Sequence, residues 1–138
     1  MRIRKIATAG AVALTTAVAS LTFATQAQAA QACPDYYACL WYNSDWEGAI
    51  YVSADPVADY TGKKFVTSAY TNGSNGAGLG VKNNSASAYN ADPDYRFRVY
   101  YNSNFNGTYA YQTFSPLSGG NFTATMKNQN ASGQWIGW

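Results

Sequence analysis

Alternating apolar and polar positions are the main pattern along this chain, and they predict β-strands. In residues 95–101, Tyr95, Phe97, Val99 and Tyr101 fall on one face of a strand and the arginines between them on the other. Residues 122–127 alternate in the same way. Shorter strands are predicted at 38–42, 48–52, 80–82, 108–114 and 134–138. No helical periodicity follows residue 33, so the pattern predicts an all-β protein.

The strands belong to an internal repeat. Residues 41–48 (WYNSDWEG) recur as residues 100–107 (YYNSNFNG), and residues 81–88 (VKNNSASA) recur as residues 126–133 (MKNQNASG). Because both pairs keep the same order, the repeated unit is a whole supersecondary motif. We therefore expect a sandwich of two Greek-key motifs, one over about 33–90 and the other over about 95–138.

Each copy of the first signature predicts a hairpin folded back over its own sheet. Such a fold needs a residue with positive φ, which Gly48 and Gly107 supply at little cost. The flanking aromatic residues then stack across the fold, and a later serine holds the bent backbone closed. The aromatic residues are Trp41 and Trp46 in the first copy and Tyr100 and Phe105 in the second, and the serines are Ser87 and Ser132.

The N-terminus has the layout of a signal peptide. Three cations in residues 1–5 precede an uncharged apolar stretch, and two small-x-small sites end at Ala29 and Ala32. We expect a signal peptide over 1–29, with cleavage after Ala32 as the second choice, and a single domain over 30–138. An uncleaved anchor helix and a lipoprotein lipidated at Cys33 are weaker interpretations. In an exported chain, Cys33 and Cys39 are expected to form a disulfide.

Charge and residue usage exclude several functions. Without residues 1–5, six cations face seven anions, so the net charge is −1 and no basic patch indicates nucleic acid. The chain has no histidine, which removes serine and cysteine triads and histidine-bound zinc. The carboxylate pairs lie in predicted turns, where bonds to the backbone explain them better than catalysis. We expect a protein that is not an enzyme. The pairs are Asp45 with Glu47, Asp55 with Asp59, and Asp92 with Asp94.

The repeated signature, an aromatic residue, four residues, an aromatic residue, one residue and glycine, resembles that of the βγ-crystallin superfamily. Cys33, Cys39 and the following residues 41–48 are similar more narrowly to a secreted actinobacterial peptidase-inhibitor family. Its name-giving member inhibits metalloproteases of the thermolysin type. The resemblance implies an extracellular protease as partner. Inhibitors of this kind can carry a further disulfide that braces the reactive loop, and this chain has only two cysteines.

An inhibitor needs an exposed, rigid loop that enters the protease in an extended form. Proline beside an aliphatic residue suits a metalloprotease pocket that prefers apolar side chains. Two segments fit this description, one with Pro56 and Val57 and the other with Pro116 and Leu117. Each of them is also explained as a simple loop between strands.

Two other kinds of binding stay open. Crystallin-type calcium sites are similar to residues 83–88, which makes Asn83, Asn84 and Ser87 candidate ligands, although the segment has no carboxylate. Polar loops that close the hairpins explain it better, so no cofactor is expected. The twelve tyrosines and four tryptophans also suit a carbohydrate- or cell-wall-binding module. We expect a monomer that leaves the membrane once the signal is cleaved.

Overall fold

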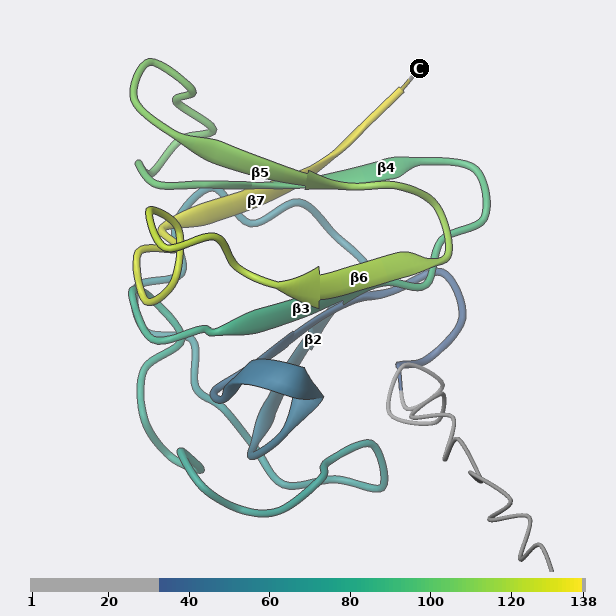
Figure 1. Cartoon of the computed structure of the whole chain (residues 1–138), viewed down its shortest axis with the longest axis vertical. Coiled ribbons are helices and arrows are strands. Elements are labelled where there is room, and N and C mark those ends of the chain that lie inside the picture. The colour runs from purple at the N-terminus through teal and green to yellow at the C-terminus, as the bar shows by residue number, and fades with distance from the viewer. Residues whose placement is uncertain (1–32, 138) are drawn as a thin grey trace, which may run out of the picture.

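The computed structural model describes residues 33–137, so the predicted signal peptide and its cleavage sites lie outside the described residues. The regular secondary structure of the described chain is almost entirely β-strand, in two antiparallel sheets joined by long turns and loops (Figure 1). One short 3-10 turn, η2 (Ser44–Trp46), follows the first strand. The strands are β1 (Ala38–Trp41), β2 (Ile50–Ser53), β3 (Ser87–Asn90), β4 (Arg96–Tyr100), β5 (Tyr111–Phe114), β6 (Ser118–Asn121) and β7 (Ser132–Ile136). The all-β prediction is confirmed.

The two halves of the chain exchange a sheet edge. The first sheet has the order β2-β1-β3-β6, so its last strand comes from the second half, and the second sheet has the order β5-β4-β7. In return, Val57 of the first half forms a bridge with Gly133 of β7, with N–H···O distances of 2.8 and 2.9 Å in the two directions. Because each half completes the other's sheet, neither half buries its apolar face alone.

The main core lies between the two sheets. Alternate residues of β1 and β4 point into it, among them Leu40, Phe97 and Val99, which are fully or almost fully buried. Tyr60, Phe65, Phe114, Phe122 and Met126 fill it from the loops and from β5.

A second apolar cluster covers the outer face of the first sheet. Trp41, Ile50 and Cys39 are completely buried there, although they point away from the main core. The Cys33–Cys39 disulfide, with a Cα–Cα distance of 5.9 Å, attaches the start of the described chain to β1, which confirms the predicted pairing. The outer face of the first sheet is therefore occupied by the chain itself.

The structure corrects two predicted strands. Residues 122–127 form a turn, in which the amides of Met126 and Lys127 both donate to the Thr123 carbonyl, at 2.9 and 2.8 Å. Phe122 and Met126 are buried, whereas Ala124 is exposed. A spacing of four also fits one helical turn, and this explains the misleading alternation. Residues 80–82 contribute only an isolated bridge between Gly80 and Lys64.

Two strands that the pattern did not predict are β3 and β6. The sequence of β6, Ser-Gly-Gly-Asn, has no strand-forming side chain. Its glycine is required by contact, because a Cβ on Gly119 would lie 2.4 Å from the Ala88 carbonyl oxygen of β3. This strand forms because its backbone approaches that of β3 closely. Sequence periodicity does not predict such an approach.

Candidate functional site

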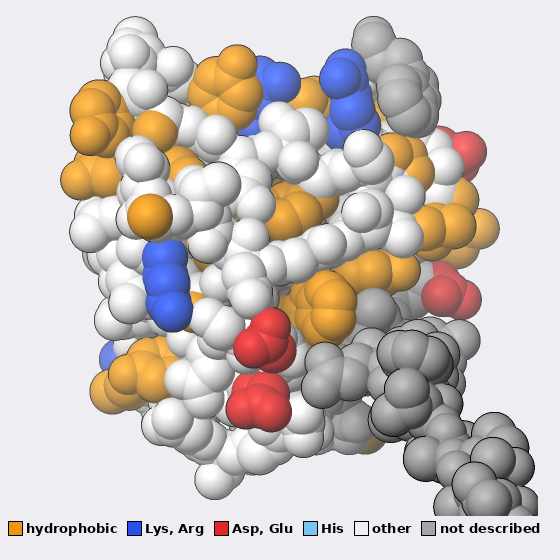
Figure 2. All heavy atoms as spheres, in the orientation of Figure 1, with side chains coloured by type: hydrophobic (Ala, Val, Ile, Leu, Met, Phe, Trp, Pro, Cys, Tyr) orange, Lys and Arg blue, Asp and Glu red, His pale blue; other side chains and the backbone are white. Residues whose placement is uncertain are grey.

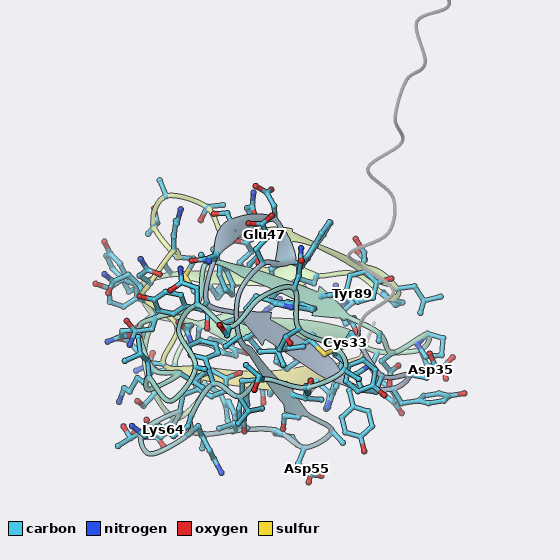
Figure 3. The ribbon with its side chains drawn as sticks, turned by 90° about the horizontal axis from the view of Figure 1, so that it is seen from below. Cys33, Asp35, Glu47, Asp55, Lys64 and Tyr89 are labelled. Atoms are coloured by element: carbon cyan, nitrogen blue, oxygen red, sulfur yellow. A yellow bond between two sulfur atoms is a disulfide. The ribbon has the colours of Figure 1, made fainter. Side chains whose placement is uncertain are left out.

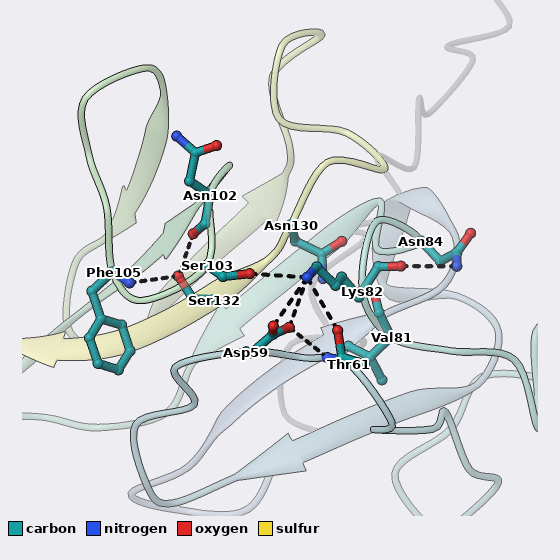
Figure 4. Close-up of polar contacts among 10 residues, drawn as sticks. All are labelled: Asp59, Thr61, Val81, Lys82, Asn84, Asn102, Ser103, Phe105, Asn130 and Ser132. Atoms are coloured by element: carbon teal, nitrogen blue, oxygen red, sulfur yellow. Dashed lines mark hydrogen bonds and ion pairs between the residues drawn. The ribbon is translucent and has the colours of Figure 1, made fainter.

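The two folded hairpins are closed by equivalent serine contacts. In the first half, the Ser87 hydroxyl donates to the Asn43 carbonyl (2.7 Å) and accepts from the Trp46 amide (3.1 Å). In the second half, Ser132 donates to the Asn102 carbonyl (2.7 Å) and accepts from the Phe105 amide (3.1 Å), as Figure 4 shows. Equal contacts at equal distances mean that the sequence repeat is also a structural repeat.

Glycine plays different roles in the two hairpins. Gly48 has a φ of +80°, but Gly107 is not in the left-handed region, which corrects the sequence expectation. Gly107 instead lies close to two rings, and a Cβ there would be in tight contact with the Tyr111 ring, at 3.3 Å. The left-handed residues shared by both hairpins are Asp45 and Trp46 in the first and Asn104 and Phe105 in the second, with φ between 57° and 60°.

The aromatic contacts over the hairpins also differ. Tyr100 and Phe105 form a tilted pair with ring centroids 6.2 Å apart. Trp46 packs edge-on against Tyr89 (6.5 Å), while Trp41 lies in the same cluster beneath it. The first hairpin is thus held against the neighbouring strand β3 as well as against its own.

We predict that Ser87→Ala and Ser132→Ala each lower the free energy of unfolding by about 1–3 kcal/mol. Each substitution leaves one carbonyl and one amide of the folded hairpin without a hydrogen-bond partner. Chemical denaturation measures the loss, with Ser118→Ala as an exposed control in β6. The two losses should agree within about 1 kcal/mol, because the contacts are the same. A neutral result in either hairpin would contradict the equivalence of the two serines.

Of the two predicted inhibitory segments, the one with Pro56 and Val57 is tied into the fold. Pro56 is exposed, but Val57 is buried, and both its N–H and its carbonyl are bonded to Gly133. Val57 is therefore part of the edge that the first half gives to the second sheet. It is not an exposed anchor.

The other predicted segment, residues 115–117, joins the two sheets between β5 and β6. Pro116 is half-buried and Leu117 is 60 % exposed, with a φ of +51°. The Leu117 amide donates to the Asp92 carbonyl (3.1 Å), and its carbonyl accepts from the Tyr89 hydroxyl (3.0 Å). Leu117 is accessible, but its backbone is neither extended nor available to a partner.

A buried asparagine braces this connection. Asn90, the last residue of β3, is fully buried, and its side-chain amide donates to the carbonyls of Tyr95 (2.8 Å), Phe114 (3.2 Å) and Ser115 (3.1 Å). Its side-chain oxygen accepts from the Asp92 amide (2.9 Å). One side chain thus joins the inter-half linker, the end of β5 and the following loop.

A third exposed segment, residues 106–110, was not recognised from the sequence, because residues 108–110 were predicted as strand. Tyr109 at its tip is 68 % exposed, and its ring lies against Tyr101 with centroids 4.7 Å apart. The Thr108 amide donates to the Asn106 side chain (2.9 Å), and the Ala110 carbonyl accepts from the Tyr101 amide (3.0 Å). The Tyr109 backbone makes no hydrogen bond to residues 33–137.

Two of the three candidate calcium ligands, Asn84 and Ser87, use their side chains in hydrogen bonds within the fold. Ser87 closes the first hairpin, and the Asn84 side-chain amide donates to the carbonyls of Gly80 (2.9 Å) and Lys82 (3.2 Å). Asn83 has a φ of +59° and donates its amide to Asn130 (2.8 Å). Within residues 33–137, no three His, Cys, Asp or Glu side chains group together as metal ligands.

Several carboxylates cap turns, and among these Asp92 is buried whereas Asp59 is exposed. One Asp92 oxygen accepts the amides of Asp94 and Tyr95, both at 2.7 Å. The Thr61 amide and, after it, the Lys82 ammonium hold the pKa of the Asp59 carboxyl well below its ordinary value. Asp35, Glu47 and Asp55 lie at separate places on the periphery in Figure 3.

Charged side chains are scattered over the surface. On the face drawn in Figure 2, Lys and Arg side chains are separated by uncharged and hydrophobic ones and form no continuous patch. In the described part of the chain, no helix has the length and apolar character needed to cross a membrane.

Solved structures place the fold. A structure from work on the evolution of the eye lens βγ-crystallin domain fold matches with a TM-score of 0.58 and 13 % sequence identity, over 77 % of this chain and 91 % of that one. The N-terminal domain of protein S matches with a TM-score of 0.51 and 15 % identity, over 73 % of this chain and 96 % of that one. The protein therefore has a βγ-crystallin fold.

The sequence comparison defines the family. Residues 26–112 match the model of peptidase inhibitor family I36, which covers more than half of the chain. The chain thus belongs to peptidase inhibitor family I36, and this membership indicates an inhibitor and not an enzyme. No curated protein matches the sequence.

Proposed function

We propose that this chain is a secreted inhibitor of extracellular metalloproteases and that it binds them through the Tyr109 loop, residues 106–110. The observation that carries the assignment of the loop is the combination of an exposed aromatic side chain with a backbone that has no hydrogen-bond partner among residues 33–137. Family membership supports the inhibitory activity. The predicted signal peptide and the disulfide support secretion.

The three candidate loops differ in whether their backbone N–H and carbonyl groups are already hydrogen-bonded within the protein. A segment that enters a protease cleft in an extended form pairs its own N–H and carbonyl groups with the enzyme. Val57 and Leu117 have both groups bonded within the protein, and Leu117 has a positive φ. Tyr109 has a negative φ, and neither its N–H nor its carbonyl is hydrogen-bonded within the described part of the chain. The Tyr109 loop bends at residues 108–109, and it offers the unbonded backbone groups that the two proline segments lack.

Aromatic packing stiffens the Tyr109 loop in place of a second disulfide. The Tyr109 ring packs edge-on against Tyr101, and Tyr111 at the start of β5 packs against Tyr100 (6.0 Å) and beneath the Arg98 guanidinium (4.1 Å). Each ring pair contributes about 0.5–1.5 kcal/mol beyond burial. A loop that is already ordered loses less entropy on binding, and this raises its affinity.

The target class follows from the resemblance to inhibitors of thermolysin-type enzymes and from the apolar anchor. We expect the exported chain to reduce thermolysin-type activity at micromolar concentration or below and to leave a subtilisin-type enzyme active. Titration of the purified chain against both enzymes, with a chromogenic peptide substrate, measures this. Inhibition of the subtilisin-type enzyme alone would overturn the metalloprotease assignment, and inhibition of neither would overturn the proposed function.

Carbohydrate binding remains the alternative. Exposed tyrosines such as Tyr36, Tyr95 and Tyr111 offer faces on which sugar rings stack, with exposed fractions of 50–62 %. Retention of the chain on chitin or on cell-wall polymer, together with no inhibition of either protease, would favour this function.

A further inference from the structure

Two lysines connect the halves of the chain in equivalent ways. Lys82, in the first half, donates to the Ser103 hydroxyl in the hairpin of the second half at 3.0 Å. Lys127, in the second half, donates to the Ser44 hydroxyl in the hairpin of the first half, also at 3.0 Å. Lys82 and Lys127 occupy equivalent positions in the repeated segments, and Ser44 and Ser103 do so in the repeated hairpins.

The backbone next to these lysines has the same symmetry. Asn83 and Asn128, which follow the two lysines, have φ values of +59° and +57°. The Asn83 amide donates to the Asn130 carbonyl (2.8 Å), and the Asn128 amide donates to the Ser85 carbonyl (2.9 Å). The segments 82–85 and 127–130 are therefore hydrogen-bonded to each other through their backbones. The lysine of each segment reaches the hairpin of the opposite half.

The surroundings of the two ammonium groups differ in charge. Lys82 contacts the Asp59 carboxylate (3.0 Å) and the Thr61 hydroxyl (3.2 Å) in addition to Ser103, as Figure 4 shows. Lys127 lines a hollow of about 180 Å³ together with Ser44, Asn84 and Asn128, and none of the residues that line this hollow is acidic.

These contacts do not fit a calcium site. Calcium takes six to eight oxygen ligands and binds more tightly as the number of carboxylates rises. The hollow beside Asn84 has a lysine ammonium in its lining and no carboxylate, and the Ser87 hydroxyl already closes the first hairpin. A divalent cation at this position would lie next to a positive charge with only neutral ligands.

We propose that the ammonium groups of Lys82 and Lys127 act as built-in cations that tie each half to the hairpin of the other, so that residues 83–87 bind no calcium. Each lysine contacts the hairpin of the other half. Its loss should therefore affect residues in the half that does not carry the substitution, which the loss of a local contact would not do. Loss of Lys82 should loosen the hairpin at Ser103, and loss of Lys127 should loosen the hairpin at Ser44.

The test uses the exported chain and its variants Lys82→Met and Lys127→Met, with Lys64→Met as the control. Lys64 is exposed at the periphery, and its side chain has no hydrogen bond or ion pair to residues 33–137 (Figure 3). We expect each of the two variants to lower the melting temperature by about 1–4 °C relative to the control, with the larger shift for Lys82→Met because its ammonium has more partners. Hydrogen exchange should rise at residues 103–105 in Lys82→Met and at residues 44–46 in Lys127→Met.

Calcium supplies the second part of the test. Millimolar calcium and then EDTA should leave the melting temperature of the unmodified chain unchanged, and titration calorimetry with calcium should give no saturable heat. A saturable heat, or a rise in melting temperature with calcium, would overturn the exclusion of metal. Exchange that rises only within the half that carries the substituted lysine, or melting shifts equal to that of Lys64→Met, would overturn the tie between halves.

Discussion

Replacing Asn90 by alanine is expected to lower the free energy of unfolding by about 3–5 kcal/mol, a large loss for a domain of this size. The substitution leaves the carbonyls of Tyr95, Phe114 and Ser115 and the Asp92 amide without their partner, in a region where water does not reach Asn90. Each buried polar group left unpaired costs about 1–3 kcal/mol, and partial relaxation of the loop reduces the sum.

Chemical denaturation of Asn90→Ala measures this loss, and two further variants make the result specific. Asn75→Ala removes an exposed asparagine and should change stability by no more than about 0.5 kcal/mol. Asn90→Asp keeps the shape but directs a carboxylate at three carbonyl oxygens, so it should be at least as destabilising at neutral pH. Because protonation restores one donor, this variant should regain stability as the pH falls. A loss below 1 kcal/mol for Asn90→Ala would contradict the bracing role.

The sequence could not reveal this role of Asn90. Its three acceptors belong to residues 95, 114 and 115, and these come together only because β3, the linker and the end of β5 meet where the two halves exchange an edge. In the sequence, Asn90 is one of many asparagines before a turn. A local sequence pattern predicts where the backbone turns. It does not predict which distant carbonyl groups become buried and require a hydrogen-bond donor.

The features predicted correctly depend on short-range or repeated information. The all-β class follows from alternation, the crystallin fold from the repeated hairpin signature, and the Cys33–Cys39 pairing from two cysteines in an exported chain. Two of the failures involve contacts between halves. Glycine-rich β6 is a strand because Gly119 allows close approach to β3, and Val57 is buried because it pairs with Gly133.

The sequence predicted the candidate site only in part, again because contacts between distant residues determine it. Proline beside an aliphatic residue marked two loops, but whether their backbone groups are already bonded depends on the exchanged edges and on Asn90 and Tyr89. The strand predicted over 108–114 included part of the Tyr109 loop. In the structure this strand, β5, begins only at Tyr111. The loop follows the second hairpin, whose Phe105 amide is bonded to Ser132 of β7, and Tyr109 at its tip is exposed.

Tyr109→Ala is expected to weaken inhibition of a thermolysin-type enzyme by about 30- to 1,000-fold, the effect of removing an anchor worth about 2–4 kcal/mol. The side chain is 68 % exposed and its loss leaves no cavity, so the loss of stability should not exceed that of its ring pair with Tyr101, about 0.5–1.5 kcal/mol. Leu117→Ala is the matched control, because Leu117 is similarly exposed at the other end of β5. Inhibition constants and melting curves for both variants decide the matter. If Leu117→Ala loses inhibition and Tyr109→Ala keeps it, the braced loop at 115–117 is the inhibitory element, and an available backbone is not what selects the loop.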